Sequence, residues 1–471
     1  MANDNNKGSP AGDVGVAGVS DDKGPPTGPG YEATVRTGDT NISVDLSSVP
    51  VTVQNINFDG LNRTKNEFVE KAISDVFLTK NFEQLILKVG RAQSKLQSLG
   101  VFSEVATVVD TSKGDDATPD GYDVTFAVKE LRRINGGLSG MVGTNEGTAQ
   151  FGINFPNVLG SGEKVSVNHF VSSSSGKKTE INVMVPFPYI GTEFSTSLYS
   201  CESINPWSAV TTSATGNLLQ YNMKIGKNDT LSIQWHGVWR CLNALGSRGT
   251  TFPVREYLGN TIKSAFRFIY ATDKRDQPIF PCSGTLRKVD VEFSGAFGDA
   301  KFLKVETDWQ YNWSLFENVV LQGSLRCGLL QPLSSSPMSY NINDLFFLGG
   351  PSSLRGFHMR GVGPRCQQNA LGGKVVWASA IHLYAPLPFL NSKFSFTENL
   401  RLHGFVNCGG IGQNVAECSD ADNVRISSGI GLAYRFRNAA RIEINYCYPF
   451  KFSAKDRCVN GFQWGIGVDF L

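Results

Sequence analysis

The residue types best suited to metal binding and covalent catalysis are thinly spread along this chain. Its five histidines are isolated, and its nine cysteines occur singly, without a Cys-x-x-Cys pair. Because zinc sites and disulfide frameworks need such residues at short, regular spacings, neither kind of site is predicted. The cysteines are interpreted as the reduced thiols of an intracellular protein.

Motifs of nucleotide and acyl chemistry are missing as well. The sequence contains no Gly-x-x-x-x-Gly-Lys-Ser/Thr phosphate loop and no Gly-x-Ser-x-Gly nucleophile elbow. The run CGGIG at 408–412 lacks the strand-to-helix setting that a dinucleotide site requires. We therefore predict no catalytic residue, no cofactor and no enzymatic activity.

Charge and apolar patterning exclude two further classes of protein. The net charge is only +2, so there is no basic footprint for nucleic acid. No stretch of about eighteen apolar residues occurs, which excludes a transmembrane helix. The opening run MANDNNKGSPAGDVGVAGVS has neither the apolar core of a secretory signal nor the Arg-rich pattern of a transit peptide.

The most unusual segment is the glycine- and proline-rich run FFLGGPSSLRGFHMRGVGPR at 346–365. It is flanked by alternating strands and is too long for an ordinary hairpin turn. Arg355 carries a planar guanidinium that suits fixed acceptors, and Gly356 permits backbone conformations closed to other residues. Phe357 supplies an apolar contact. The segment is interpreted as a structured loop, and the alternative is a surface hairpin with an incidental Arg-Gly turn.

The sequence around this loop divides into three zones. Residues 1–48 are small and polar, cannot bury enough surface to offset their ordering entropy, and are predicted to be disordered. Residues 49–130 predict a strand, two helices and two strands, which make a small α+β module. The first helix is expected to begin with a capping box formed by Thr64 and Glu67.

From residue 131 to 471 the pattern is alternation, as in RIEINYCY and FQWGIGVDFL. The apolar faces carry aromatic residues near strand ends, and the polar faces carry charges in strand interiors, which suits a wet lumen. About 340 residues, at roughly twenty per strand and connection, make about sixteen strands. The predicted fold class is mainly β, a transmembrane antiparallel barrel, closed because an open edge in lipid leaves backbone groups unpaired. A soluble sandwich or propeller is the alternative.

The loop and this organisation together resemble a known family. LGGPSSLRGF followed by RGVGP is similar to the sixth-loop signature of the outer-membrane protein assembly superfamily. Within it, the resemblance is to the central barrel subunits of the mitochondrial sorting and assembly machinery. Residues 49–130, with the run LQSLGVFSEV, resemble one polypeptide-transport-associated (POTRA) domain, and YPFKFSAKDRCVNGFQWGIGVDFL resembles the family's last two strands.

The resemblance implies that the loop, at about 342–372, folds back into the lumen and is anchored on the inner wall. Many relatives present acidic residues to the loop arginine, but the matching positions here hold Asn407, in FVNCG, and His382. Glu443 is a third inward candidate, and the sequence leaves the choice open. The residues expected at the anchored tip are Leu354, Arg355, Gly356 and Phe357.

The resemblance also implies a function, which is the insertion of β-barrel precursors into the mitochondrial outer membrane. The working part is then the seam between the first and last strands, where glycines weaken packing and an exposed edge templates an incoming strand. Barrel curvature and small lumen volume are the alternative explanation of the glycines. The seam residues expected are Gly136, Gly137, Gly140, Ile466, Val468 and Phe470.

The partners implied are β-barrel precursors, accessory subunits of the assembly complex and the lipid bilayer. A complex that organises the inner membrane is a further candidate partner, and the family implies a POTRA domain in the intermembrane space. The rivals are a passive solute pore and a polypeptide-translocating pore. A folded module ahead of the first strand has no use in a simple pore, whereas an assembly factor can dock precursors on it.

Overall fold

The computed structural model describes most of the chain, and no helix among its described residues is long and apolar enough to cross a membrane. The expected seam residues Val468 and Phe470 lie outside the described part. The described residues are 32–37, 40–46, 48–113, 117–142, 147–172, 176–188, 190–246, 249–316, 318–387, 399–436, 440–467 and 471.

The first described elements form a two-stranded antiparallel ribbon, β1 (Glu32–Thr37) and β2 (Thr40–Asp45). This ribbon differs from the disorder expected over 1–48, of which residues 1–31 lie outside the described part. Its sequences, EATVRT and TNISVD, contain several β-branched residues, which favour extended backbone even within a polar segment. Overall composition therefore concealed a local preference for strand.

The next segment has the predicted order of strand, helix, helix, strand and strand. Its strands form a three-stranded sheet with β5 between β3 and β4. On the second helix, the apolar side chains that recur at three- and four-residue steps are buried, as the sequence pattern requires. The elements are β3 (Thr52–Asp59), α1 (Asn66–Ile73), η1 (Ser74–Leu78), α2 (Phe82–Ser98), β4 (Phe102–Thr111) and β5 (Gly121–Glu130).

The expected capping box of α1 is wrong. Lys65 occupies the N-cap position and makes no side-chain cap, whereas Thr64 donates its hydroxyl to Glu130 at 2.7 Å. The same Glu130 oxygen also accepts the backbone N–H groups of Asn62, Arg63 and Thr64 at 3.2, 3.0 and 2.9 Å. Burial raises the pKa of Glu130, but these hydrogen bonds outweigh it and lower the pKa to about 2. A distant carboxylate thus replaces the local cap.

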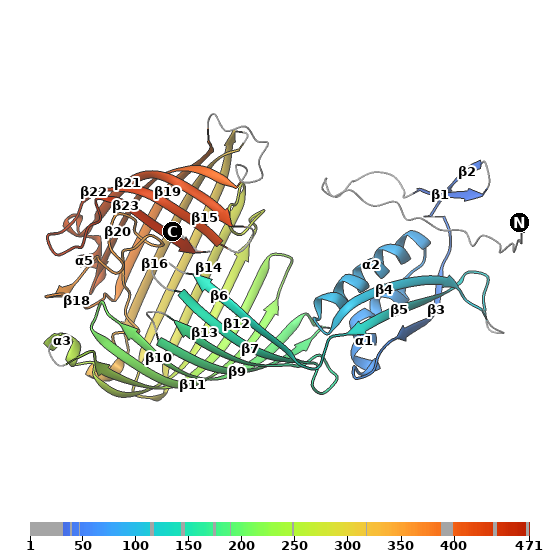
Figure 1. Cartoon of the computed structure of the whole chain (residues 1–471), viewed down its shortest axis with the longest axis horizontal. Coiled ribbons are helices and arrows are strands. Elements are labelled where there is room, and N and C mark those ends of the chain that lie inside the picture. Colours follow the sequence, from blue (N-terminus) through green and yellow to red (C-terminus); the bar gives the residue numbers. More distant parts are fainter. Residues whose placement is uncertain are drawn as a thin grey trace, which may run out of the picture. The chain divides into compact units, whose positions relative to one another are not determined.

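Apart from two short strands within a loop, the remaining strands form one sixteen-stranded antiparallel sheet whose order runs from β23 to β6 (Figure 1). Neighbours in the sheet are neighbours in sequence, except that β19 pairs with β16 across a long loop. The predicted number of about sixteen strands is confirmed. The strands are β6 (Asn135–Val142), β7 (Gly147–Pro156), β8 (Lys164–Ser172), β9 (Gly176–Phe187), β10 (Thr192–Asn205), β11 (Val210–Lys224), β12 (Asp229–Ala244), β13 (Gly259–Asp273), β14 (Gly284–Gly298), β15 (Phe302–Phe316), β16 (Val319–Pro332), β19 (Val375–Pro386), β20 (Leu400–Gly412), β21 (Arg425–Phe436), β22 (Ala440–Lys451) and β23 (Gly461–Gly467).

The two faces of this sheet are inverted relative to a soluble protein. On β22, Ile444, Tyr446 and Tyr448 are exposed, whereas the alternating residues Glu443 and Asn445 are buried. Figure 1 shows the strands curving round into a barrel, so the buried polar face is the inner one. An apolar outer face and a polar inner face are what a barrel in a bilayer requires.

The loop between β16 and β19 packs on this inner face through an apolar cluster. Leu354 and Phe357 from the loop are fully buried beside Val376, Ala378 and Ile411 of the wall. The loop contains the short elements η2 (Pro337–Ser339), β17 (Arg365–Cys366) and β18 (Asn369–Ala370). Other connections carry α3 (Phe252–Arg255), α5 (Val415–Ser419) and η3 (Ala421–Asn423), none of them long.

Candidate functional site

The lumen loop, defined as residues 341–374, turns sharply at glycines where other residues do not fit. Gly349 has φ +110°, and a side chain there would lie 2.7 Å from the carbonyl oxygen of His358. Gly356 has φ +84°, and its added Cβ would lie 3.0 Å from Cβ of Ser427 on β21. Gly356 therefore combines a left-handed backbone with close contact to the wall, and both require glycine.

Arg355, next to this glycine, is the largest fully buried side chain among the described residues. Its Nε donates to Oε2 of Glu443 at 3.0 Å, and Nη2 lies 3.0 Å from the same oxygen. Its Nη1 donates to the carbonyl oxygen of Leu471 at 3.4 Å, and the guanidinium lies over the ring of Phe405. Charge, hydrogen bonds and a ring face together offset the loss of hydration of the guanidinium.

Glu443 also binds a second guanidinium. Arg441, two residues earlier on β22, places Nε 3.0 Å from Oε1 of Glu443. The carboxylate and the Arg355 guanidinium are both closed to solvent, so this carboxylate is shared between a loop cation and a wall cation. Such sharing limits the desolvation penalty that a lone buried charge would pay.

The backbone of the loop tip is held as firmly as its side chain. The carbonyl oxygen of Arg355 accepts from Oγ of Ser427 and from Nδ2 of Asn407, the latter at 3.3 Å. Gln463 on β23 accepts from the Gly356 N–H at 3.0 Å and donates to the Phe357 carbonyl at 2.8 Å. The loop tip is therefore bonded to three strands, β20, β21 and β23, in addition to the ion pair with β22.

Comparison with known families agrees with this architecture. A family model described as the Omp85 superfamily domain matches residues 157–470. The chain belongs to the Omp85 superfamily. This finding confirms the resemblance suggested by the loop motif.

Curated Omp85 relatives extend the likeness over nearly the whole chain. Sorting and assembly machinery component 50 homolog B of Xenopus laevis is 39% identical over 442 residues, covering 90% of this chain and 92% of that protein. The human sorting and assembly machinery component 50 homolog is 39% identical over 437 residues, with the same coverage. The match therefore includes residues ahead of the sixteen-stranded sheet.

A solved structure shares the fold of this chain. BamA from Haemophilus ducreyi lacking POTRA domains 1–3 superposes with a TM-score of 0.74 over 93% of this chain and 88% of that chain. Its identity is only 18%, so the likeness concerns the fold alone. The fold of this Omp85 chain is a transmembrane antiparallel barrel of sixteen strands.

The three candidate partners of Arg355 take different roles in this Omp85 barrel. Glu443 pairs with the guanidinium, and Asn407 binds the Arg355 carbonyl instead. His382 lies 2.6 Å from the Leu471 carbonyl oxygen through Nε2 and 3.0 Å from His403 through Nδ1. His403 in turn contacts Asn445, which donates to Glu443, so His382 is linked to the ion pair indirectly.

Sequence reasoning missed Arg441, Ser427 and Gln463 as parts of this site. A signal for Arg441 exists, because Arg441, Glu443 and Asn445 occupy every second position of β22 and therefore share its polar face. Gln463 similarly occupies the polar face of the last strand. No local pattern marks Ser427, which becomes important only because Gly356 approaches it.

The expected seam residues lie on the two end strands of the sheet as far as they are described. Gly136, Gly137 and Gly140 are on β6, and Ile466 is on β23 opposite Ile442. A side chain at Gly137 or Gly140 would meet nothing within 4 Å. Gly137 and Gly140 lie on opposite faces of β6, and packing against neighbouring atoms requires glycine at neither position.

Proposed function

We propose that this protein inserts and assembles β-barrel precursors into the mitochondrial outer membrane, as the core subunit of a sorting and assembly complex. The observation that carries the proposal is the 39% identity to sorting and assembly machinery component 50 homologs over about nine-tenths of both chains. The barrel with an apolar exterior and an anchored lumen loop is consistent with this role. We assign no catalytic residue to it.

The working part in this proposal is the seam between β6 and β23. An incoming precursor strand pairs with an edge of the seam by β-augmentation, so that its hydrogen bonds replace those of the seam. Each backbone hydrogen bond broken in the seam is replaced by one of the same kind to the precursor, so the exchange runs close to energetic balance, whereas an edge left unpaired in lipid would be costly. Insertion then needs no nucleotide. The open space beside Gly137, on the face opposite the exposed Leu138, supports a loosely packed edge on β6.

The lumen loop has a defined role in this mechanism. Because Gln463 of β23 binds Gly356 and Phe357 at the tip, the loop holds the inner face of a seam strand. Arg355 and Glu443 hold the same tip to β22, the neighbour of β23. We propose that the tip supports β23 while its outer edge exchanges partners. The proposed tip residues are Leu354, Arg355, Gly356 and Phe357.

The division of labour along the chain follows the same proposal. Residues 49–130 act as a single POTRA domain in the intermembrane space, where precursors arrive, and residues 131–471 form the barrel with its loop at about 342–372. Residues 1–48 are an N-terminal extension. Accessory subunits and an inner-membrane organising complex are the proposed further partners.

A passive pore is the main rival, and the lumen loop weighs against it. The apolar cluster between Leu354, Phe357 and the wall occupies lumen space that a solute channel would keep wet. A polypeptide-translocating pore is distinguished by its cargo. Porin precursors that co-purify with the chain support insertion, whereas soluble imported or secreted chains support translocation.

The proposal is tested by depleting the protein and following the import of a labelled porin precursor into isolated mitochondria. We expect porin assembly to be lost while a soluble matrix precursor, added in parallel, still enters at early times of depletion. Restoring the wild-type chain restores porin assembly. Normal porin assembly without the protein would exclude the proposed function.

A further inference from the structure

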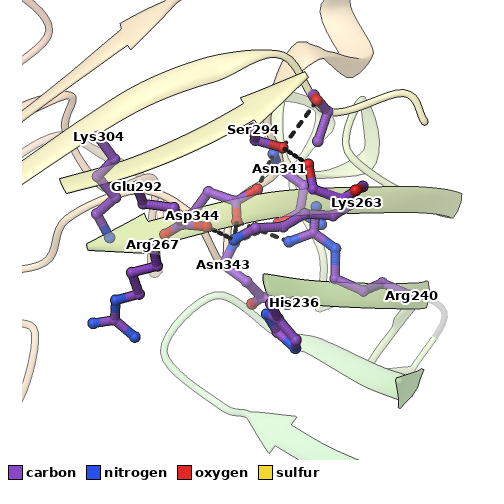
Figure 2. A network of polar contacts seen from close by, with 12 residues as sticks. His236, Arg240, Lys263, Arg267, Glu292, Ser294, Lys304, Asn341, Asn343 and Asp344 are labelled. Carbon is purple, nitrogen blue, oxygen red and sulfur yellow. Dashed lines mark hydrogen bonds and ion pairs between the residues drawn. The ribbon is translucent and has the colours of Figure 1, made fainter. Parts of the chain in front are cut away.

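The start of the lumen loop carries a second buried charge that no part of the Arg355 site explains. Asp344 is 4% exposed and faces the inner wall at β12 and β13 (Figure 2). Its Oδ1 lies 2.8 Å from Nη1 of Arg240 and 3.2 Å from Nζ of Lys263. Its Oδ2 accepts the backbone N–H of Asn341 at 3.0 Å. We call residues 341–344, at the start of the loop, the loop root. One carboxylate thus joins the root to two adjacent strands.

The two cations belong to the wall and not to the loop. Arg240 is on β12 and Lys263 on β13, and Lys263 also pairs with Glu292 on β14. Arg240 is buried like Asp344, and in the described residues Asp344 is its ion-pair partner. Because buried charges must be paired, Arg240 and Asp344 hold each other in place.

Neutral contacts at the root fix its position along the wall. Asn343 donates to Oγ1 of Thr212 at 3.0 Å and accepts from Nδ2 of Asn205 at 3.0 Å. Its backbone N–H binds the side-chain oxygen of Asn341. Among the described residues, every ion pair between the root and the wall involves Asp344, so its charge is the part that a conservative substitution can remove alone.

The root and the tip are attached to different walls of the barrel. The root is held on β12 and β13, whereas the tip is held on β20 to β23. Several strands separate these two regions in the sheet order in either direction. A loop fixed at both ends bridges the lumen, so movement of β23 must strain the loop or break the contacts at its tip.

We propose that Asp344 is a second positioning residue of the lumen loop, which anchors the root so that the tip can support the seam strand. The activity part of this inference rests on the proposed function in barrel assembly. The anchoring of the root by Asp344 depends only on contacts within this chain. Without the charge of Asp344, the root would keep the neutral contacts of Asn343 and lose its ionic hold on β12 and β13.

The experiment substitutes Asp344→Asn, which removes the charge and keeps the shape. The position of the root is read from the disulfide yield of an added Asn343→Cys/Thr212→Cys pair in the membrane-embedded full chain. Asp344→Glu is the rescue variant. Asp290→Asn is the matched control, because Asp290 pairs with Arg267 within the wall and, among the described residues, makes no hydrogen bond or ion pair with the loop.

We expect Asp344→Asn to lower the root disulfide yield severalfold and to slow porin precursor assembly severalfold. The amount of barrel that resists alkaline extraction should stay unchanged, and Asp344→Glu should recover both readouts. Asp290→Asn should change neither. If Asp344→Asn fails to accumulate, Arg240→Gln breaks the same pair from the wall side and should loosen the root in the same way.

Two results would overturn the inference. An unchanged root disulfide in Asp344→Asn or Arg240→Gln means that the charge does not hold the root. A loosened root with normal precursor assembly means that the contact is structural and does not position the loop for function. If the wild-type chain itself assembles no precursor, the proposed function fails, whereas the disulfide yield still tests the anchor.

Discussion

Glu443 illustrates how this barrel stabilises charge away from water. It receives Arg355 from the loop and Arg441 from its own strand, and neither Glu443 nor Arg355 is exposed to solvent. A buried ion pair contributes little relative to an apolar alternative, but removing one partner leaves an uncompensated charge. The pair therefore specifies where the loop tip must lie more than it stabilises the fold.

At this residue scale, Glu443→Gln should detach the loop tip and destabilise the barrel by about 3–5 kcal/mol. The amide keeps the shape of the side chain but leaves two guanidinium groups without their shared carboxylate. Denaturant unfolding in detergent micelles measures the free energy, and protease sensitivity near residue 355 reports on the tip.

Glu306→Gln is the matched control for that substitution. Glu306 pairs with Lys304 along the same strand, and its side chain is 37% exposed. Because exposed pairs contribute only about 0–1 kcal/mol, its loss should be small. Equal effects of the two substitutions would contradict the special role of the Glu443 pair.

At the scale of elements, β23 joins the seam to the loop. It is an end strand of the sheet, pairs with β22, and presents Gln463 inward to the loop tip. Its outward side chains Phe462 and Trp464 are exposed. One short strand thus contacts the lipid face, the lumen loop and the proposed site of precursor entry.

Covalent locking of the seam should stop precursor insertion and leave the barrel folded. Cysteine pairs that join Gly136, Gly137 or Gly140 to positions 465–467 would be oxidised in the membrane, and porin assembly measured before and after reduction. Insertion should fall in proportion to the crosslinked fraction, because the edge can no longer exchange hydrogen bonds, and should recover on reduction.

A crosslink inside the sheet is the control for locking. Ser139 and Gln150 are register partners on β6 and β7, and their side chains are in contact. A disulfide between Ser139→Cys and Gln150→Cys stiffens the same strand without closing the seam, so insertion should continue. Full insertion despite a completely crosslinked seam would rule out precursor entry between β6 and β23.

At the scale of the whole molecule, the orientation of the two sheet faces should be visible in lipid. Trp309 and Trp464 are 45% and 51% exposed on the outer face. Trp207, by contrast, is covered by Arg360 of the lumen loop, whose guanidinium carbon lies 3.7 Å from the ring centre.

Brominated lipids should therefore quench the fluorescence of Trp309 and Trp464 and leave that of Trp207 largely unchanged. Replacing each tryptophan in turn by phenylalanine and measuring the loss of quenchable signal assigns the contributions. Two results would be incompatible with a membrane barrel. One is that the lipids quench neither Trp309 nor Trp464, and the other is that alkaline extraction releases the chain in soluble form.

Much of the sheet could be predicted because every strand of a membrane barrel has one face toward lipid and one toward the lumen, and its side chains alternate between apolar and polar accordingly. Alternation of Glu443, Ile444, Asn445 and Tyr446 alone predicts which side chains of β22 face the lumen. The failures were at places where a distant residue competes with a local signal. Thr64 had the spacing of a capping box, but Glu130 binds its hydroxyl across 66 positions of sequence.

The sequence by itself determined the strand number, the inward and outward faces, and the presence of a structured loop. The arginine of this loop requires fixed hydrogen-bond acceptors, and its glycines permit backbone conformations closed to other residues. These properties follow from local periodicity and residue chemistry, which are present in any short window. Only the tertiary structure selected Glu443 as the carboxylate for Arg355 and Asp344 as the partner of Arg240. Such pairs depend on where the loop crosses the lumen, and that path is set by contacts between segments about a hundred residues apart.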